Sequence, residues 1–417
     1  MNKTAIIGGG AAGLFAACRL IQNNIKPTIF EKNELVGRKL GITGKGRCNL
    51  TNKTSNEEFI NNLTKNPKFM YSSVSMCNCN DVMNLFENVF KVPLKTERGN
   101  RVFPQSDKAT DIVLAMKNFI INNGGTIKQE TVTDLIKNGE NVITEIVTNK
   151  KSYKDFTYII LCTGGKSYPL TGSTGDGYIF AKKLGHNVTE LIPSLSALVC
   201  KETYCKDMQG LSLKNISISV FDESNIKVYT DFGELLFTHF GLSGPIILSA
   251  STHTRNLPKS EYKLFIDLKP ALSNEVLNQR LLNDFTKNKN KTISNVLHGL
   301  LPSKMIQPFL EMTGIDGNTQ VNNITKTQRA TILEYLKNMP FTVTDFRPIN
   351  EAIVTSGGIP VNEINSKTMN SKIIKNLYFA GEIIDVDAYT GGFNLQIAFS
   401  TANASVQAIS NLITKGE

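Results

Sequence analysis

Glycines spaced for binding a dinucleotide stand at the start of the chain, in the stretch KTAIIGGGAAGLFAACRLIQNNIKPTIFEK. The apolar run 5–7 predicts a buried strand, Gly8, Gly10 and Gly13 follow it, and a second predicted strand ends at Glu31. Here the first glycine permits a tight turn, the second lets a pyrophosphate approach the backbone, and the third lets a helix pack against the strand. The helix N-terminus attracts phosphates, and the carboxylate accepts hydrogen bonds from a ribose and repels a 2′-phosphate. The stretch therefore predicts a dinucleotide site.

A second stretch typical of a ligand loop is GRKLGITGKGRCNLTN, residues 37–52. Its glycines allow a ligand to approach the backbone closely. Arg38 and Lys39 carry charge for a diphosphate, and Thr43 offers a polar edge. Cys48 lies in the same stretch, but a flavin disulfide reductase would carry a second cysteine shortly after it, and none follows. We interpret Cys48 as a packing residue or a residue at the edge of a flavin, not as half of a redox pair.

The elements that must position these residues follow from the apolar periodicity. In chain order we expect helices over 57–92, a hairpin over 95–104, a helix over 107–122, strands over 126–128, 142–148 and 156–161, and a glycine-rich loop leading into a helix over 168–185. The strand at 156–161 ends in Cys162-Thr163-Gly164-Gly165, as a strand does when it terminates against a ligand. Further strands over 351–358 and 377–385, then a long helix to about Leu412, return the chain to the first domain.

The middle of the chain has a different pattern. After Pro193 the apolar residues alternate with period two, which predicts antiparallel strands, and after Leu272 they recur at helical spacing. We therefore expect an α/β fold: a Rossmann-like domain built from both chain ends, residues 1–193 and 342–417. The inserted domain, residues 194–341, would be β-rich over 194–270 and form a small helical cap over 271–341.

Composition narrows the class of protein. The chain has 417 residues, 41% of them hydrophobic and 20% charged, and a formal net charge of +10. Its lysines are scattered and form no basic stripe interleaved with aromatic residues, so we expect a basic solvated surface and no nucleic-acid partner. Seven cysteines without a disulfide or metal-ligand spacing indicate a reducing, cytoplasmic compartment and no metal site. No apolar run is long enough to span a membrane. The oligomeric state stays open.

The order of these motifs resembles the BaiN/aminoacetone-oxidase family of FAD-dependent oxidoreductases. The matching stretches cover nearly the whole chain: GGGAAG, GRKLGITGKGRCNLTN, CTGGKSYPLTGSTGDGY, FTHFGLSGP, VTSGGIPVNEINSKTMNSK and LYFAGEIIDVDAYTGGFNLQIA. The resemblance implies a flavoprotein with two dinucleotide-binding domains, non-covalent FAD held by both chain ends, and the insertion covering the flavin.

Carried over position by position, the resemblance also implies a set of FAD contacts. Those positions are Gly8, Gly10, Ala12, Gly13, Glu31, Lys32, Arg38, Lys39, Thr43, Gly44, Val132, Thr163, Gly164, Gly381, Glu382, Gly392, Asn394 and Leu395. Among them Val132 would pass the adenine, and Glu382 would lie on the flavin side of the ribityl chain. The last three would meet the pyrimidine edge of the ring. Family members commonly have Tyr where this chain has Phe393, which removes a hydroxyl from that position.

The expected reaction is a flavin-dependent oxidoreduction of a small organic substrate. NAD(P)H or an amine would be the donor, and oxygen or an unsaturated compound the acceptor. No second G-x-G-x-x-G unit is present, so a nicotinamide donor would dock transiently. The sequence offers no convincing general acid or base. His239 and Tyr389 are the candidates, with Glu363 as a further possibility.

Two other functions stay open at this point. The stretch TGG…TGSTGDGY also resembles flavoproteins of the fumarate-reductase and ketosteroid-dehydrogenase type, although the insertion is poor in the Arg and His residues that those enzymes need. From a different class, the net charge allows an FAD-containing RNA-associated or regulatory protein.

Overall fold

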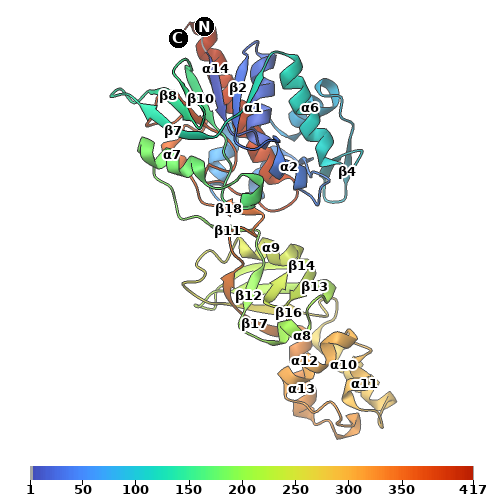
Figure 1. Cartoon of the computed structure of the whole chain (residues 1–417). Coiled ribbons are helices and arrows are strands. Elements are labelled where there is room, and N and C mark those ends of the chain that lie inside the picture. The colour runs from blue at the N-terminus through green and yellow to red at the C-terminus, as the bar shows by residue number, and fades with distance from the viewer. Residues whose placement is uncertain (1–2, 417) are drawn as a thin grey trace. The chain divides into compact units, whose positions relative to one another are not determined.

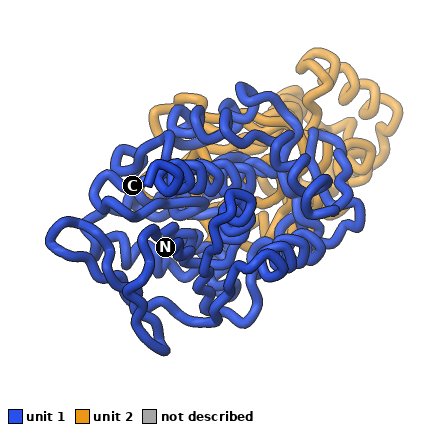
Figure 2. The backbone as a smooth tube through the Cα atoms, turned by 90° about the horizontal axis from the view of Figure 1, so that it is seen from above, with its two compact units in different colours: residues 1–194, 349–417 blue, residues 195–348 orange. Residues whose placement is uncertain are grey.

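The structure is a computed structural model that describes residues 3–416. The chain divides into two compact units, and Figure 2 colours them separately: unit 1 contains residues 1–194 and 349–417, and unit 2 contains residues 195–348. We expected the inserted domain to end at 341, but this position falls inside strand β17 (Met339–Phe346). Because β17 pairs with β12 and β16 of unit 2, the residues just after 341 belong to the inserted unit.

A five-stranded parallel sheet forms the centre of unit 1, in the order β19-β10-β1-β2-β6. Its strands are β1 (Thr4–Ile7), β2 (Pro27–Glu31), β6 (Thr126–Gln129), β10 (Tyr158–Leu161) and β19 (Leu377–Phe379). Strands β1, β2, β10 and β19 are almost wholly buried, which explains their continuous apolar runs. All carboxyl ends lie at one edge of the sheet, and this edge is where parallel sheets bind ligands.

Three helices pack together in one core of this unit: α1 (Ala11–Gln22), α6 (Ala109–Asn122) and α14 (Phe393–Lys415). The ring of Phe15 on α1 stacks on Phe399 of α14, with centroids 4.7 Å apart. In Figure 1 the red C-terminal helix accordingly runs beside the blue N-terminal one. The two ends of the chain therefore build one domain.

The segment expected to be helical over 57–92 is broken into five short pieces: α3 (Asn56–Asn61), the 3₁₀ turn η1 (Pro67–Met70), α4 (Tyr71–Met76), α5 (Cys79–Asn84) and the π-helical turn η2 (Leu85–Val89). Asn66, which caps the Pro67 turn, has a left-handed backbone, and Cys77 is extended. These two residues interrupt the helical hydrogen bonding, although the apolar spacing continues.

Unit 1 also contains two small antiparallel sheets. One has the order β3-β5-β4 and includes the expected hairpin: β3 (Thr51–Asn52), β4 (Leu94–Glu97) and β5 (Arg101–Pro104). The other contains β7 (Val132–Lys137), β8 (Ile143–Thr148) and β9 (Ser152–Tyr153). Strand β7 was not expected from the sequence. Its alternating burial is weak, and pairing with β8 decides its conformation.

The remaining elements of unit 1 surround the carboxyl edge of the parallel sheet. They are the short helix α2 (Arg38–Ile42), the 3₁₀ turns η3 (Pro169–Thr171) and η5 (Val361–Glu363), helix α7 (Asp176–Leu184), and the antiparallel pair β11 (Ile192–Ser194) and β18 (Val354–Ser356). The strands expected over 351–358 and 377–385 are shorter than predicted, because positive backbone φ angles at Gly357, Gly358 and Gly381 end them.

Unit 2 contains a closed antiparallel barrel in the order β12-β15-β14-β13-β16-β17. Its other strands are β12 (Leu198–Cys200), β13 (Ser212–Phe221), β14 (Lys227–Thr238), β15 (Gly241–Ser243) and β16 (Tyr262–Asp267), with the short helices α8 (Tyr204–Asp207) and α9 (Pro245–Ser251). The expected helical part follows as α10 (Asn274–Lys287), α11 (Ile293–Leu297), α12 (Ser303–Thr313), η4 (Val321–Asn323) and α13 (Lys326–Lys337). The α/β fold class with a β-rich insertion is confirmed, and closure into a barrel is the feature that the sequence did not predict. Within residues 3–416 no helix combines the length and apolar character needed to cross a membrane.

Candidate functional site

The first glycine loop leaves an open space at one position only. A β-carbon at Gly8 would lie 2.5 Å from the carbonyl oxygen of Cys162, and one at Gly13 would lie 1.9 Å from the carbonyl oxygen of Gly8. At Gly10, in contrast, a β-carbon would have no atom within 4 Å. Gly10 precedes α1, whose first turn carries no acidic residue and no side-chain cap. Gly8 and Gly13 are thus needed for packing, whereas the backbone at Gly10 faces space that a phosphate group could fill.

Glu31 is held rigidly at the end of β2. Its Oε2 accepts a hydrogen bond from the backbone N of Gly9 at 2.8 Å, and its Oε1 accepts from the backbone N and the side-chain Nδ2 of Asn33 at 2.8 and 2.7 Å. The residue is 9% exposed. An ionised carboxylate has about four lone-pair sites, so capacity remains for a ribose hydroxyl.

The residues beside Glu31 close this end of the site. The Nζ of Lys32 lies 2.5 Å from the Oδ2 of Asp176, in the first turn of α7. The backbone N of Glu130 donates to the carbonyl oxygen of Glu31 at 3.0 Å. The buried Val132 follows Glu130 by two residues. The structure therefore places Lys32 and Val132 near the Glu31 segment, but the ammonium of Lys32 is already paired with a carboxylate.

The second glycine loop meets the first directly. The backbone N of Gly37 donates to the carbonyl oxygen of Gly9 at 2.8 Å. Arg38 is exposed, and its Nη1 donates to the Oδ1 of Asn33 at 2.9 Å. The hydroxyl of Thr43 donates to the carbonyl oxygen of Leu40 at 2.7 Å, and Gly44 has a positive φ of 57°. Both expected ligand loops thus lie against one another at the same edge of the sheet.

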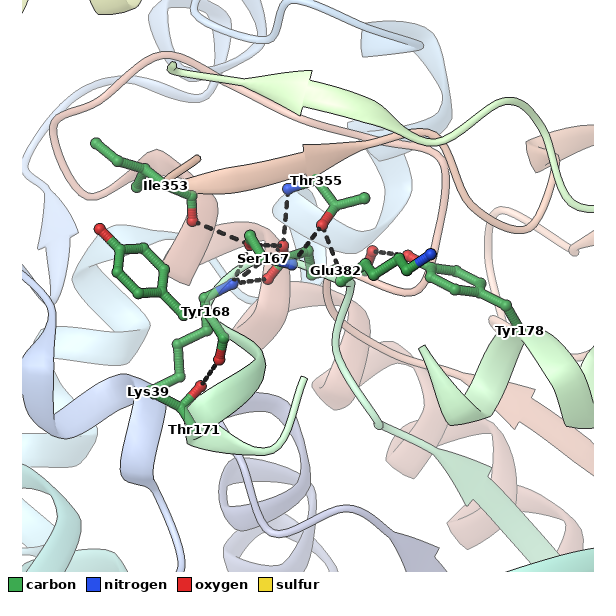
Figure 3. A network of polar contacts seen from close by, with 9 residues as sticks. Lys39, Ser167, Tyr168, Thr171, Tyr178, Ile353, Thr355 and Glu382 are labelled. Carbon is green, nitrogen blue, oxygen red and sulfur yellow. Dashed lines mark hydrogen bonds and ion pairs between the residues drawn. The ribbon is translucent and has the colours of Figure 1, made fainter. Parts of the chain in front are cut away.

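Lys39, expected at the diphosphate and ribityl chain, joins a mostly buried polar network (Figure 3). Its Nζ lies 2.8 Å from the Oε2 of Glu382 and 2.7 Å from the Oγ of Ser167. Only 22% of the Lys39 side chain and 20% of the Glu382 side chain are exposed. The ion pair connects α2 with the segment directly after β19, so it links the two ends of the chain.

Thr355 of β18 completes this network. Its backbone N donates to the Oε1 of Glu382 at 2.9 Å, and its Oγ1 accepts from the backbone N of Lys166 at 2.8 Å and of Ser167 at 3.1 Å. A β-carbon at Gly165 would lie 2.5 Å from the Oγ1 of Thr355, which explains the glycine there. Sequence reasoning did not single out Ser167 and Thr355. The only signal was their place in the stretches TGGKSY and VTSGG, beside the expected ligand residues.

The loop after β10 carries an unsatisfied polar group. The Oγ1 of Thr163 is buried and has no hydrogen-bond partner among the described residues. Gly164 next to it has a positive φ of 73°, and a β-carbon at Gly381 would lie 2.9 Å from the Cβ of Ala12. These three positions follow β10 and β19, so they share the carboxyl edge with the first glycine loop.

The N-terminus of α14 lies in the same domain. Gly392 must be glycine, because a β-carbon would lie 2.4 Å from the carbonyl oxygen of Thr51. The side chain of Asn394 holds the preceding loop, with Oδ1 accepting from the N of Ala388 at 3.1 Å and Nδ2 donating to its O at 2.9 Å. Leu395 packs partly buried in the core beside α1. The side-chain amide of Asn394 is therefore already used, and any contact of this residue with a ligand would use its backbone N–H.

The catalytic candidates belong to different units. His239 lies in unit 2 between β14 and β15, with its ring 5.0 Å from that of Phe240, whereas Tyr389 lies in unit 1. Phe393 is buried and faces Phe59 at 5.9 Å. Glu363 is bound by His186, whose Nδ1 lies 2.8 Å from its Oε2. None of these pairings assigns a general acid.

The cysteines form no disulfide. Burial raises the pKa of Cys48 to about 12, so its thiolate is scarce at neutral pH. All seven cysteines are unpaired. Within the part of the chain that the structure describes, no group of three His, Cys, Asp or Glu residues could hold a metal ion.

Comparison with known proteins places this geometry in a family. The family model described as HI0933-like protein Rossmann domain matches residues 2–408. A curated relative from Haemophilus influenzae named ribosomal RNA dihydrouridine synthase is 29% identical over 98% of this chain and 98% of its own length. A relative from Clostridium scindens named 3-dehydro-bile acid delta(4,6)-reductase is 25% identical over 96% of this chain and 97% of its own.

Among solved structures, the chain resembles 3-ketosteroid-delta4-(5alpha)-dehydrogenase from Rhodococcus jostii RHA1, crystallised with 4-androstene-3,17-dione. The TM-score is 0.51 with 13% identity, over 98% of this chain and 96% of the other. At that identity the likeness concerns the fold.

Proposed function

The chain belongs to the HI0933-like Rossmann-domain family, and we propose that it is an FAD-dependent reductase of carbon–carbon double bonds conjugated with a carbonyl group. The observation that carries the proposal is the carboxyl edge of the parallel sheet. There the open backbone at Gly10, the fixed carboxylate of Glu31 and the buried, unpartnered hydroxyl of Thr163 lie at the ends of β1, β2 and β10.

These residues fit an extended dinucleotide such as FAD. Gly10 and the start of α1 would receive the pyrophosphate, and Glu31 would receive the adenosine ribose. The network of Lys39, Ser167 and Glu382 would hold the loops at the flavin end. Bound FAD supplies transfer of a hydride or an electron pair. The protein's own task is to orient the ligand and exclude water.

The names of the two curated relatives support a common reaction class. A delta(4,6)-reductase of a 3-dehydro-bile acid and a dihydrouridine synthase both saturate a carbon–carbon double bond conjugated with a carbonyl group. The two relatives thus share a reaction type, although their substrates differ. The donor we propose is NAD(P)H, which would dock transiently because the chain has a single G-x-G-x-x-G unit.

Anaerobic titration tests this function. The purified protein should be yellow, and NADH or NADPH should bleach its flavin band. A 3-oxo-4-ene steroid should then restore the band and gain two hydrogens, whereas the saturated 3-oxo steroid should not. A colourless protein that does not take up FAD contradicts the proposal. Reduction by aminoacetone followed by reoxidation only by oxygen, with release of peroxide, would assign the protein as an amine oxidase instead.

A second candidate narrows the acceptor to a uracil base in ribosomal RNA. The formal net charge of +10 favours it, because a polyanionic substrate is bound chiefly through its phosphates. The Haemophilus relative, matched over 98% of both chains, supports the same narrowing. Reoxidation of the reduced protein by uridine-containing RNA, but not by RNA whose uridines are replaced by cytidine, would distinguish this acceptor from a steroid.

A further inference from the structure

An ion-pair cluster gathers three segments of unit 1 around Arg47. Its Nε donates to the Oδ1 of Asp107 at 2.7 Å, and its Nη2 contacts Glu97 at the end of β4. The Nζ of Lys95 lies 2.6 Å from the Oδ2 of Asp107. The guanidinium also lies over the ring of Phe103, 4.2 Å from its centroid. Loop 43–48, hairpin β4–β5 and the turn before α6 therefore converge on one side chain.

The carboxylates of these segments form their ion pairs within the cluster. Hydrogen bonds from Lys95 and Arg47 hold the pKa of the Asp107 carboxyl below its usual range, and Arg47 does the same for Glu97. Two further carboxylates nearby in sequence, Asp111 and Glu58, accept hydrogen bonds from the hydroxyls of Ser106 and Thr54.

Five cations beside the cluster stay exposed. They are Lys45, Lys53, Arg98, Arg101 and Lys108, and within the described residues none of them forms an ion pair with a carboxylate. The backbone N of Lys53 donates to the carbonyl oxygen of Asn100 at 2.8 Å, and that of Ala109 donates to Gly46 at 2.8 Å. These bonds place Lys53 beside the hairpin turn and Lys108 beside loop 43–48. We call these five residues the hairpin surface; β4, α2 and α6 lie on one side of unit 1 in Figure 1.

The backbone of the hairpin surface is accessible as well. At Gly46 and at Gly99 a β-carbon would have no atom within 4 Å, and both residues have positive φ angles, 82° and 75°. Each glycine is flanked by basic residues, Lys45 and Arg47 in one case and Arg98 in the other. The backbone N of Gly46 already donates to the carbonyl oxygen of Thr43 at 3.1 Å, so an anion at this turn would contact the flanking cationic side chains, which the open space at both glycines lets it approach closely.

We propose that the hairpin surface binds the phosphodiester backbone of RNA. Five exposed cations spread over adjoining segments fit a polymer with many phosphates better than a single small anion. Arginine guanidinium groups are suited to phosphate oxygens. The surface includes Lys45 of loop 37–52, which also belongs to the expected ligand loop. This inference rests on the second form of the proposed function, in which the acceptor is a uracil base.

Salt-dependent binding of labelled single-stranded RNA to the full-length protein tests the proposal. The variant Arg98→Gln/Lys108→Gln should weaken binding on the order of tenfold at low salt, equally for any RNA sequence. The slope of log affinity against log salt should fall by about 1.4, because each phosphate contact contributes about 0.7 for single strands. The matched control Lys182→Gln/Lys367→Gln removes two exposed lysines of unit 1 outside the surface and should leave the slope unchanged.

The outcomes separate this inference from the proposed function. A wild-type protein that does not bind RNA at low salt, or equal weakening by both double variants, overturns the hairpin surface. Preference for anionic lipid vesicles over RNA overturns it too. Surface-dependent RNA binding without reduction of any acceptor supports the surface and contradicts only the assigned reaction. The flavin absorption of both double variants should equal that of the wild type, which excludes misfolding as the cause.

Discussion

The ammonium of Lys39 lies 2.8 Å from the Oε2 of Glu382, and this ion pair joins residues 343 positions apart in the chain. Ser167 contacts both partners, at 2.7 Å from the Nζ of Lys39 and 3.1 Å from the Oε1 of Glu382. Because all three side chains are mostly buried, each depends on the others for its hydrogen bonds. The network therefore fixes the geometry of three loops at the carboxyl edge of the sheet.

The variant Lys39→Met should lose this geometry. We expect unfolding free energy to fall by about 2 kcal/mol, since a partly buried carboxylate loses its charged partner. FAD affinity should fall on the order of tenfold. Urea unfolding and flavin titration measure the two effects. Lys166→Met, which removes an exposed lysine directly before Ser167, is the matched control, and equal behaviour of the two variants would show that the ion pair has no such role.

Two glycine substitutions should have different effects. Gly13→Ala should destabilise the fold by about 3 kcal/mol, because its β-carbon would collide with the carbonyl oxygen of Gly8. Gly10→Ala should leave the stability of the FAD-free protein almost unchanged and weaken FAD binding instead, since its β-carbon would fill the open space. Thermal unfolding with and without FAD separates the two. If Gly10→Ala binds FAD as the wild type does, the phosphates do not lie there.

Stability should fall in mild acid because of His186. Burial lowers the pKa of this imidazole, although Glu363 partly opposes the shift. The folded state thus holds the neutral form, and the unfolded chain, with a pKa of about 6.5, binds a proton first. The free energy of unfolding should therefore decrease as pH falls below about 6.5. Urea midpoints between about pH 5 and 8 should show this decrease in the wild type. It should be smaller in His186→Gln, and an equal pH dependence in both would exclude His186 as the cause.

Cys48 should not react in the native protein. Its pKa of about 12 and its full burial leave little thiolate and no access for an alkylating reagent. Mass spectrometry after iodoacetamide treatment at about pH 8 should find Cys48 unmodified in the folded protein and modified after unfolding in urea. Rapid native labelling, or a mixed disulfide with Cys48, would revive the disulfide-reductase chemistry that the sequence argued against.

Local patterns in the sequence predicted much of the scaffold. Gly8, Gly10 and Gly13 predicted the turn between β1 and α1, because the backbone there has few alternatives that leave room for packing. The hairpin at Arg98-Gly99-Asn100 and the helix ending at Asn122 are confirmed for the same reason. The prediction of helix over 57–92 was wrong where the helical structure is interrupted. Apolar spacing does not show that Asn66 and Cys77 leave the helical conformation.

The positions of the polar side chains depended on distant contacts. The sequence by itself determined the dinucleotide fold and its order of motifs, because turns, strand lengths and helix periodicity are set by neighbouring residues. Only the tertiary structure decided that Lys39 pairs with Glu382 and that Ser167 and Thr355 join them. It also decided that Glu97 and Asp107 pair with Arg47, which leaves the neighbouring cations exposed. These partners are far apart in the chain. Which charge is neutralised and which remains exposed is therefore decided by packing, because a hydrogen bond requires its two atoms to lie within about 3 Å.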